Sequence, residues 1–182
     1  MRERVEDPSG LVLRRWVAAD ARAVLAAFAD PLMRRQTNQP LDHVAAAEQW
    51  IAARDDHWTA GSAYSFAVVD GSGTVLGQMG VGPVDRRHDV GWVSYWTTSV
   101  ARGRGVASRA CRSLARWAFA DAALFRLELG HQVDNLASCR VARAAGFTVE
   151  GRQRQKLSYD GVRYDVELHA RLATDAEPRT KV

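Results

Sequence analysis

The pattern of residues changes from strand to helix between positions 89 and 122, and this change constrains the fold more than any other feature of the chain. The segment DVGWVSYWTTSV (89–100) is rich in aromatic and β-branched residues, which is typical of a strand. A turn with two glycines, RGRGVAS (102–108), follows it. Apolar residues then recur at helical spacing as far as about Ala122, at Val106, Ala110, Leu114, Trp117 and Ala118. The chain therefore predicts a strand that passes through a glycine turn directly into a long amphipathic helix.

The glycine turn has the ingredients of an anion site. The first turn of a helix leaves backbone N–H groups without intrahelical partners, and the helix dipole favours a negative charge there. Gly103 and Gly105 lack a Cβ, so the backbone can approach a ligand closely, and Arg102 and Arg104 add positive charge. The turn lacks the lysine of the Walker motif and the third glycine of the dinucleotide motif. Taken alone, it fits an exposed polar turn at least as well as a phosphate site.

Alternating patterns and turn residues predict the other elements. Helices are expected after the capping residues Asp20 and Asp42, the first of them stopped by Pro31, and a short helix is expected from Asn135 to Gly146. Strands are expected at 11–16, 64–70, 74–83, 125–133, 147–158 and 162–172. This order, β-α-α-β-β-β-α-β-α-β-β, predicts one α+β domain over residues 1–172, built on a mixed sheet with helices on its faces. The last ten residues, 173–182, are expected to form a disordered tail.

Composition and charge narrow the class of protein. The chain has 182 residues, of which 47% are hydrophobic and 25% charged, as is usual for a globular domain. It has no apolar run long enough to span a bilayer, and its N-terminus lacks the apolar core of a secretory signal, so we expect a cytoplasmic protein with no membrane partner. A net charge of +4 suits an acidic ligand but is too small to predict nucleic-acid binding. Cys111 and Cys139 are expected to be buried free thiols rather than a redox or catalytic pair.

The neighbourhood of the glycine turn resembles a known family. Residues 102–107, RGRGVA, match the motif [Q/R]-x-x-G-x-[G/A] with which GNAT-superfamily N-acetyltransferases bind the pyrophosphate of acetyl-CoA. SYWTTSVARGRGVASRA (94–110) and DNLASCRVARAAGF (134–147) are similar to the Rim-type branch, whose founding members acetylate the N-termini of ribosomal proteins. The resemblance extends from about residue 11 to 172 and is most specific over 93–147. It implies a GNAT fold, with a mostly antiparallel mixed sheet and helices on both faces.

The resemblance also implies a cosubstrate, acetyl-CoA. No metal is expected, because Cys111 and Cys139 lack close metal-ligand spacing. Backbone N–H groups of the glycine turn would bind the pyrophosphate, and the end of the preceding strand would pair with the pantetheine arm as an added strand does. Asn135 would hydrogen-bond pantetheine, Ser138 would protonate the leaving thiolate, and Arg140 would reach the phosphates. Asn135 and Ser138 also fit a simple helix-capping pair, and the two roles are compatible. The expected cosubstrate-binding residues are Trp96, Thr97, Thr98, Arg102, Gly103, Arg104, Gly105, Val106, Ala107, Ser108, Asn135, Ser138 and Arg140.

The general base is the point at which this chain departs from its relatives. Many Rim-type proteins carry a glutamate at the position of Trp92, and the tyrosine that acts as an acid elsewhere in the superfamily would fall near Ala142. Asp89, Glu128 and His131 could replace it, and for each a structural role is the alternative. Alternation turns Asp89 away from Trp92, so Glu128 and His131 are the expected bases. An α-amine has a pKa of about 8, so a protein N-terminus is already partly neutral and needs less help than a lysine.

The acceptor site is expected to form from 33–39, 92–96 and the hairpin tip 158–161. Its candidate residues are Arg34, Asn38, Trp92 and Tyr159. The alternative for Arg34 and Asn38 is a solvated loop, and the alternative for Tyr159 is an exposed turn. The expected acceptor is a protein or peptide N-terminal amine. Two alternatives stay open, a small amine such as an antibiotic, polyamine or amino-acid derivative, and a weakly active acyl-CoA sensor or scaffold. The sequence also leaves a homodimer open.

Overall fold

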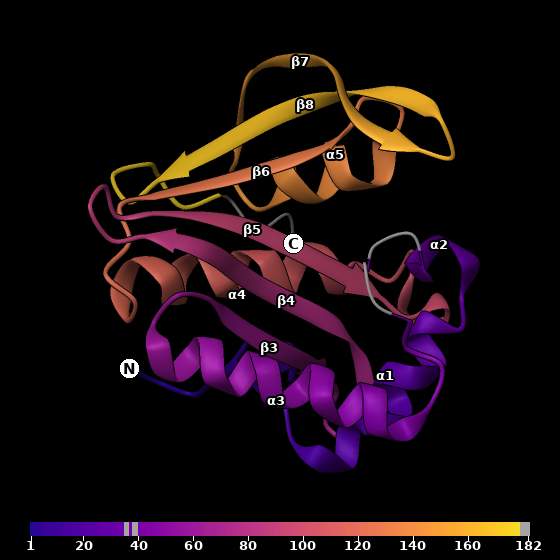
Figure 1. The fold of residues 1–182 in the computed structure, drawn as a ribbon. Coiled ribbons are helices and arrows are strands. Elements are labelled where there is room, and N and C mark those ends of the chain that lie inside the picture. Colours follow the sequence, from indigo (N-terminus) through magenta and orange to yellow (C-terminus); the bar gives the residue numbers. More distant parts are fainter. Residues whose placement is uncertain (35–36, 38–39, 179–182) are drawn as a thin grey trace.

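The computed structural model describes residues 1–34, 37 and 40–178, and its centre is one eight-stranded sheet with helices on both faces (Figure 1). The strand order is β1-β2-β3-β4-β5-β6-β8-β7, and neighbouring strands are antiparallel except for the parallel pair β5 and β6. The strands are β1 (Arg4–Glu6), β2 (Val12–Arg15), β3 (Tyr64–Val69), β4 (Val75–Asp85), β5 (Val90–Thr97), β6 (Arg126–Gln132), β7 (Thr148–Tyr159) and β8 (Val162–Leu172). The helices are α1 (Ala21–Phe28), α2 (Pro31–Arg34), α3 (Val44–Ala60), α4 (Val106–Ala120) and α5 (Leu136–Ala144). The mixed, mostly antiparallel α+β fold is therefore confirmed.

Alternation along the strands divides the core between the two faces of the sheet. In β3, Phe66 and Val68 pack in the same cluster as α4 and α5, whereas Ala67 and Val69 pack in the cluster of α1 and α3. This is the period of two that a strand covered on both sides requires. The rings of Phe66 and Trp117 meet edge to face, with centroids 4.9 Å apart, so the long helix after the glycine turn is anchored in the middle of the core.

Two elements were absent from the sequence-based expectations. Strand β1 has only three residues, two of them charged, so it has no readable alternation. It lies beside β2. Two residues before it, the Arg2 guanidinium binds the Asp121 carboxylate at 2.7 Å, and the Arg2 carbonyl accepts a hydrogen bond from the Trp117 indole at 2.8 Å. The short helix α2 begins at Pro31, which the sequence had indicated only as the end of α1. Proline is compatible with a first helical position because its missing N–H is not needed there.

The expected helix caps were partly wrong. Asp20 does precede α1, but its carboxylate binds the Arg14 guanidinium, at 2.7 Å, instead of the helix N–H groups. Helix α3 begins after His43, and Asp42 contacts the His43 ring at 2.7 Å instead of capping the helix. In both places the carboxylate binds a neighbouring side chain, the Arg14 guanidinium or the His43 ring, and does not cap the helix. By contrast, Asn135 caps α5 as expected.

The segment after Leu172 differs from the expected disordered tail over residues 173–178. Asp175 accepts a hydrogen bond from the Leu172 amide at 2.8 Å. The Glu177 carboxylate lies 3.0 Å from Arg171, whose side chain is only 1% exposed, and 3.1 Å from Arg116. A buried guanidinium needs a counter-charge, and this segment supplies it. Residues 179–182 lie outside the described part of the chain.

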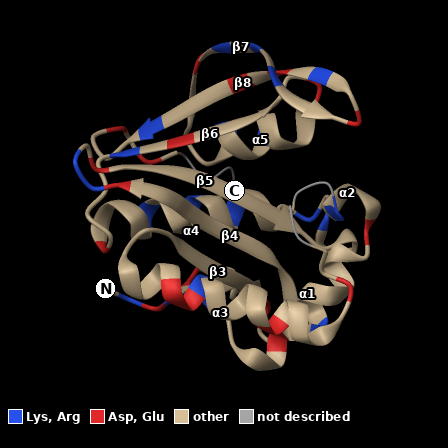
Figure 2. Cartoon of the chain, in the orientation of Figure 1, with Lys and Arg blue, Asp and Glu red and all other residues tan. Residues whose placement is uncertain are grey.

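In Figure 2, the positions of Lys and Arg and those of Asp and Glu are interspersed along the strands and helices. Among the described residues, none of the helices has the length and apolarity to cross a membrane.

Candidate active site

Strands β5 and β6 separate partway along the sheet. They pair only from Val90 to Trp92 and from Arg126 to Glu128. Beyond that point β5 continues to pair with β4, and β6 continues to pair with β8. The β5 edge facing β6 therefore carries backbone donors and acceptors without a partner strand from Val93 to Thr97. An extended ligand can add to such an edge as a further strand does.

The glycine turn lies at the end of this free edge. Gly103 and Gly105 have φ values of +73° and +72°, in the left-handed region that favours glycine. A Cβ built on either of them meets no atom within 4 Å, so the space beside the turn is open. Gly105 is the N-cap of α4, and the Arg109 amide makes the first intrahelical bond, to the Gly105 carbonyl at 3.1 Å. The N–H groups of residues 106–108 precede that bond, so the turn has the geometry of an anion cradle.

The arginines of the turn differ in their surroundings. Arg102 binds the Asp30 carboxylate at 2.7 Å, and this hydrogen bond, together with one from the Leu32 amide, lowers the pKa of Asp30. Asp30 thereby connects the turn to the start of α2. Arg104 is exposed, and its charge adds to the hydrogen bond from Ser72 in lowering the pKa of Asp70, while Arg140 is exposed on α5. The turn therefore contains one arginine already paired with a carboxylate and one that is solvated.

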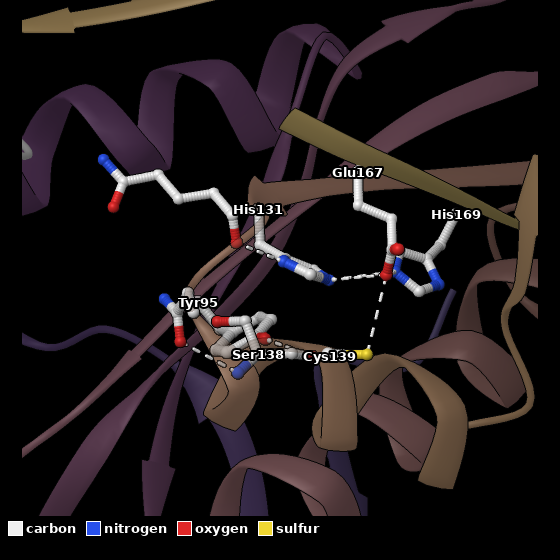
Figure 3. A network of polar contacts seen from close by, with 8 residues as sticks. Tyr95, His131, Ser138, Cys139, Glu167 and His169 are labelled. Atoms are coloured by element: carbon white, nitrogen blue, oxygen red, sulfur yellow. Dashed lines mark hydrogen bonds and ion pairs between the residues drawn. The ribbon is translucent and has the colours of Figure 1, made fainter. Parts of the chain in front are cut away.

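Helix α5 begins where β6 diverges from β5. The Asn135 side chain accepts a hydrogen bond from the Ser138 amide at 3.0 Å, which is the capping geometry that the sequence predicted. The Tyr95 hydroxyl lies 3.5 Å from the Ser138 carbonyl, so the diverging strand β5 reaches across to α5 (Figure 3). Burial raises the pKa of Tyr95 well above its usual value of about 10, so the hydroxyl keeps its proton. The sequence analysis missed Tyr95, although alternation places it on the opposite face from Trp96.

A group of polar side chains lies beside Ser138 (Figure 3). The His131 Nε2 atom is 2.9 Å from the His169 Nε2 atom and 3.6 Å from a Glu167 carboxylate oxygen. The same oxygen is 3.0 Å from His169 Nε2 and 3.5 Å from the Cys139 sulfur. His131 Nδ1 faces the Gln132 carbonyl at 2.7 Å. Only His131 of this group was a candidate from sequence, because the others come from α5 and β8 and meet it only in the folded chain.

The two candidate bases face opposite sides of the sheet. His131 follows the buried residues Leu127 and Leu129 at a period of two and faces α5. Glu128 faces the other side, beside its register partner Trp92, and the Arg126 Nε donates a hydrogen bond to it at 2.8 Å. The structure thus brings His131, and not Glu128, to the helix that carries Ser138.

The cysteines also differ from each other. Cys111 is fully buried, as expected, and burial raises the pKa of its thiol to about 12. Cys139 is only partly buried and contacts Glu167, so the expectation of a buried structural thiol was wrong for this residue. The helical pattern could not separate the two, because it does not say which neighbours α5 will meet.

Two pockets adjoin across α1. The larger, of about 790 Å³, is lined by residues of α1 and α2, by Thr37 and by residues 40–42, among them Phe28, Arg34 and Asp42. The smaller, of about 270 Å³, is lined by Thr97, Thr98 and Arg102 among others. Ala26 lines both. The larger pocket therefore lies next to the free edge and the glycine turn.

The remaining acceptor candidates are dispersed. Trp92 is half-buried, and its ring packs toward Gly130, where an added Cβ would approach it to 2.9 Å. Tyr159 lies at the tip of the β7–β8 hairpin and pairs with the Tyr164 ring, with centroids 5.9 Å apart. Asn38 falls outside the described residues. Of the acceptor candidates in the described residues, only Arg34 lines the large pocket.

Comparison with known proteins agrees with these features. Residues 10–148 match the family model of the acetyltransferase (GNAT) domain. The chain is 28% identical over 105 residues to YdaF of Bacillus subtilis, whose name describes a ribosomal N-acetyltransferase, covering 58% of this chain and 57% of that protein. It is 34% identical over 86 residues to the N-acetyltransferase YjcK of the same organism, covering 47% and 48% of the two chains. The matches thus span about half the length of these two curated relatives.

A solved structure has the same fold. Mycobacterium smegmatis RimJ, determined in complex with a CoA disulfide, superposes with a TM-score of 0.83 at 24% identity, over 93% of this chain and 86% of that one. The family model covers the strands from β2 to β6, the glycine turn and α5, which include the free strand edge and the helix that carries Ser138. On this match, the chain belongs to the GNAT acetyltransferase family.

Proposed function

We propose that this protein transfers the acetyl group of acetyl-CoA to a primary amine, and that its acceptor is the N-terminal α-amine of a protein or peptide. The observation that carries the proposal is the separation of β5 from β6 between two specialised ends. One end is the glycine turn at the start of α4, and the other is the start of α5 with Asn135 and Ser138. A long, narrow ligand with an anionic group near one end matches this layout.

The cosubstrate would lie along the free edge of β5. Its pyrophosphate would take the N–H groups of residues 106–108, and its pantetheine amides would pair with backbone groups of Trp96, Thr97 and Thr98. Arg104 and Arg140, both exposed, would screen the phosphate charges. The family match and the CoA ligand of the similar RimJ structure support this placement.

In the proposed reaction, the amine nitrogen attacks the thioester carbonyl, the carbon–sulfur bond breaks, and CoA leaves as a thiolate that takes up a proton. The chain must hold the amine about 3–3.5 Å from the carbonyl carbon, accept the proton of the amine and supply one to the thiolate. We assign proton uptake to the pair of His131 and Glu167. Glu167 is the more exposed member, with 26% of its side chain accessible against 3% for His131.

Proton supply to the thiolate is assigned to Ser138, with Tyr95 next to it. The Tyr95 hydroxyl retains its proton because the pKa is raised by burial, so it can donate directly or hold the Ser138 turn in place. The amide groups of the free β5 edge can donate to the oxyanion that forms during attack. The weak point of this site is proton uptake, since Trp92 occupies the position at which similar proteins carry a glutamate.

An α-amine acceptor fits that weakness. It has a pKa of about 8, more than two units below that of a lysine amine, so a larger fraction is ready to attack near neutral pH. The similar protein YdaF is named a ribosomal N-acetyltransferase, which supports a protein acceptor. The deciding experiment follows free thiol release from acetyl-CoA with peptides that carry a free or a blocked N-terminus. Turnover with the free peptides only supports the proposal, and turnover only with lysine side chains contradicts it.

A small-amine acceptor is the second candidate, because the pocket of about 790 Å³ beside α1 has the size of a small-molecule site. Its lining combines apolar Leu25 and Phe28 with Arg22, Arg34 and Asp42. The same thiol-release assay with polyamines, aminoglycosides and amino-acid derivatives separates it from the peptide hypothesis. Tight CoA binding without turnover on any acceptor would favour a sensor or scaffold.

A further inference from the structure

The polar group beside Ser138 contains four side chains of the kinds that bind transition metals. They are His131 from β6, Cys139 from α5, and Glu167 and His169 from β8, and one potential ligand atom from each lies within 4.8 Å of all the others. His131 and His169 are 6% and 1% exposed, so two of the four are in the protein interior. Buried imidazoles that converge on a thiol and a carboxylate are unusual as a purely structural arrangement, because each carries polar atoms that burial penalises.

Two of the separations between these atoms match those of a tetrahedral metal site, and the other two measured ones are a few tenths of an ångström shorter. Zinc binds nitrogen and oxygen at about 2.0–2.2 Å and sulfur at about 2.3 Å, so tetrahedral angles place neighbouring ligand atoms about 3.3–3.6 Å apart. Here the carboxylate oxygen lies 3.5 Å from the Cys139 sulfur and 3.6 Å from His131 Nε2. The distances to His169 Nε2 are 3.0 Å from that oxygen and 2.9 Å from His131 Nε2. An ion at the centre requires His169 to retreat by a few tenths of an ångström. It also requires the Cys139 sulfur to move toward the imidazoles, because separations within the group extend up to 4.8 Å.

The hydrogen bonds of the rings favour ligation. The Gln132 carbonyl can only accept, so His131 Nδ1 carries the proton and its Nε2 lone pair is directed into the group. A metal-binding histidine usually donates a hydrogen bond from its other ring nitrogen to a carbonyl or carboxylate, which orients the ring. His169 Nδ1 is buried without a hydrogen-bond partner in the described structure, so no contact prevents the ring from carrying its proton there and presenting Nε2 to a metal.

The chemistry of the four ligands selects the kind of ion. Two imidazoles and a thiolate suit Zn²⁺ and other late first-row metals, whereas Mg²⁺ and Ca²⁺ prefer sites made wholly of oxygen. We propose that His131, Cys139, Glu167 and His169 form a four-ligand site for Zn²⁺. This departs from the sequence-based expectation of no metal, since the spacing of the two cysteines along the chain is not that of a ligand pair.

An ion at this site would join three elements. It would tie α5, which carries Ser138, to β6 and β8 through side-chain bonds. With four protein ligands the site is closed, as structural zinc sites are, and the ion would have no open position for substrate. It would also occupy the His131 nitrogen to which the proposed function assigns proton uptake. The binding claim itself does not depend on that function.

Cobalt is the probe for the test, because tetrahedral Co²⁺ absorbs visible light and a thiolate ligand adds a charge-transfer band in the near ultraviolet. Metal-free, reduced full-length protein is titrated with Co²⁺. The expected result is saturation at one equivalent with both features, and bleaching when Zn²⁺ is added. Cys139→Ser should remove the charge-transfer band, and His169→Gln should abolish saturable binding. Cys111→Ala and His88→Gln are the matched controls and should leave the spectrum unchanged.

Some results would overturn the proposal. These are the absence of saturable cobalt binding to folded wild-type protein, binding without the charge-transfer band, or binding that Cys139→Ser leaves unaltered. Circular dichroism checks that each variant is folded, and Glu167→Gln, at a more exposed position, replaces His169→Gln if that variant fails to fold. Thiol release from acetyl-CoA by the metal-free protein is measured separately, so a negative metal result and a failure of the proposed activity are distinguishable.

Discussion

Replacement of Gly105 by glutamate tests the assignment of the glycine turn. Gly105 has a φ of +72°, and a Cβ there meets no atom within 4 Å, so the substitution costs backbone strain without a clash. That strain is about 1–2 kcal/mol for a residue with a side chain. The new carboxylate lies at the N-terminus of α4, where the helix dipole returns about 0.3–1 kcal/mol. We therefore expect the variant to fold, with a Tm lower by a few degrees.

The effect on acetyl-CoA binding should be much larger. A carboxylate about 4 Å from one phosphate charge costs about 1 kcal/mol even at the dielectric constant of water. Two pyrophosphate charges cost about 2 kcal/mol, which raises the Kd about 30-fold. At a ligand concentration of about 100 times the wild-type Kd, ligand stabilisation falls from about 2.7 to about 0.9 kcal/mol. At about 2–4 °C per kcal/mol, the ligand-induced Tm shift falls from about 5–11 °C to about 2–4 °C.

The assay is a thermal melt with and without acetyl-CoA, and Gly10→Glu is the matched control. Gly10 has a φ of +80°, and no atom lies within 4 Å of a Cβ built there, so it carries the same strain and the same new charge in the β1–β2 turn. The control should lose stability but keep the full ligand shift. If Gly105→Glu folds and keeps that shift as well, the pyrophosphate does not bind at this turn and the reasoning is refuted.

Four further predictions follow from particular contacts. Tyr95→Phe should lower kcat about tenfold or more, because it removes a proton donor of the reaction. It should change Tm little, because the 3.5 Å hydrogen bond to the Ser138 carbonyl contributes little stability. An unchanged kcat would exclude Tyr95 from proton supply. Asp30→Asn can still accept the hydrogen bond of the Leu32 amide but loses the ion pair with Arg102. The released Arg102 should lower the KM for acetyl-CoA by about two- to fivefold. A higher KM in steady-state kinetics would show instead that Asp30 positions Arg102 for the ligand. Removal of residues 173–182 should lower Tm by about 4–8 °C, because it leaves the buried Arg171 guanidinium without the Glu177 carboxylate. Glu177→Gln should reproduce most of that loss. A truncated protein as stable as the full chain would contradict this role of Glu177. Added Zn²⁺ should inhibit acetyl transfer reversibly, with recovery on chelation, and Cys139→Ser should be less sensitive, so equal inhibition of both proteins would place the inhibition elsewhere.

Local patterns determined the elements and their order. The glycine turn was readable because a strand, two glycines and an amphipathic helix follow each other within about twenty residues, and each obeys a rule of neighbouring residues. The same holds for the Asn135 cap, which needs only a side chain and an amide three residues later. Strand β1 was not readable, because three residues without alternation acquire their structure only by pairing with β2.

Partners distant in sequence were decided by the tertiary structure. Asp20 and Asp42 had the signature of helix caps, yet a nearby guanidinium and an imidazole attracted their carboxylates, and no local rule ranks such competitors. Glu128 and His131 were equal candidates in sequence, but the direction in which the β6 side chains face placed only His131 beside α5. Cys139 and Glu167, 28 residues apart, meet only because α5 packs over β6 and β8. The sequence by itself thus determined the fold and the glycine turn, because these depend on short-range periodicity and backbone freedom. The meeting of His131, Cys139, Glu167 and His169, to which we assign the proposed acid–base and metal-binding roles, depended on which faces pack together, and only the folded chain decides that.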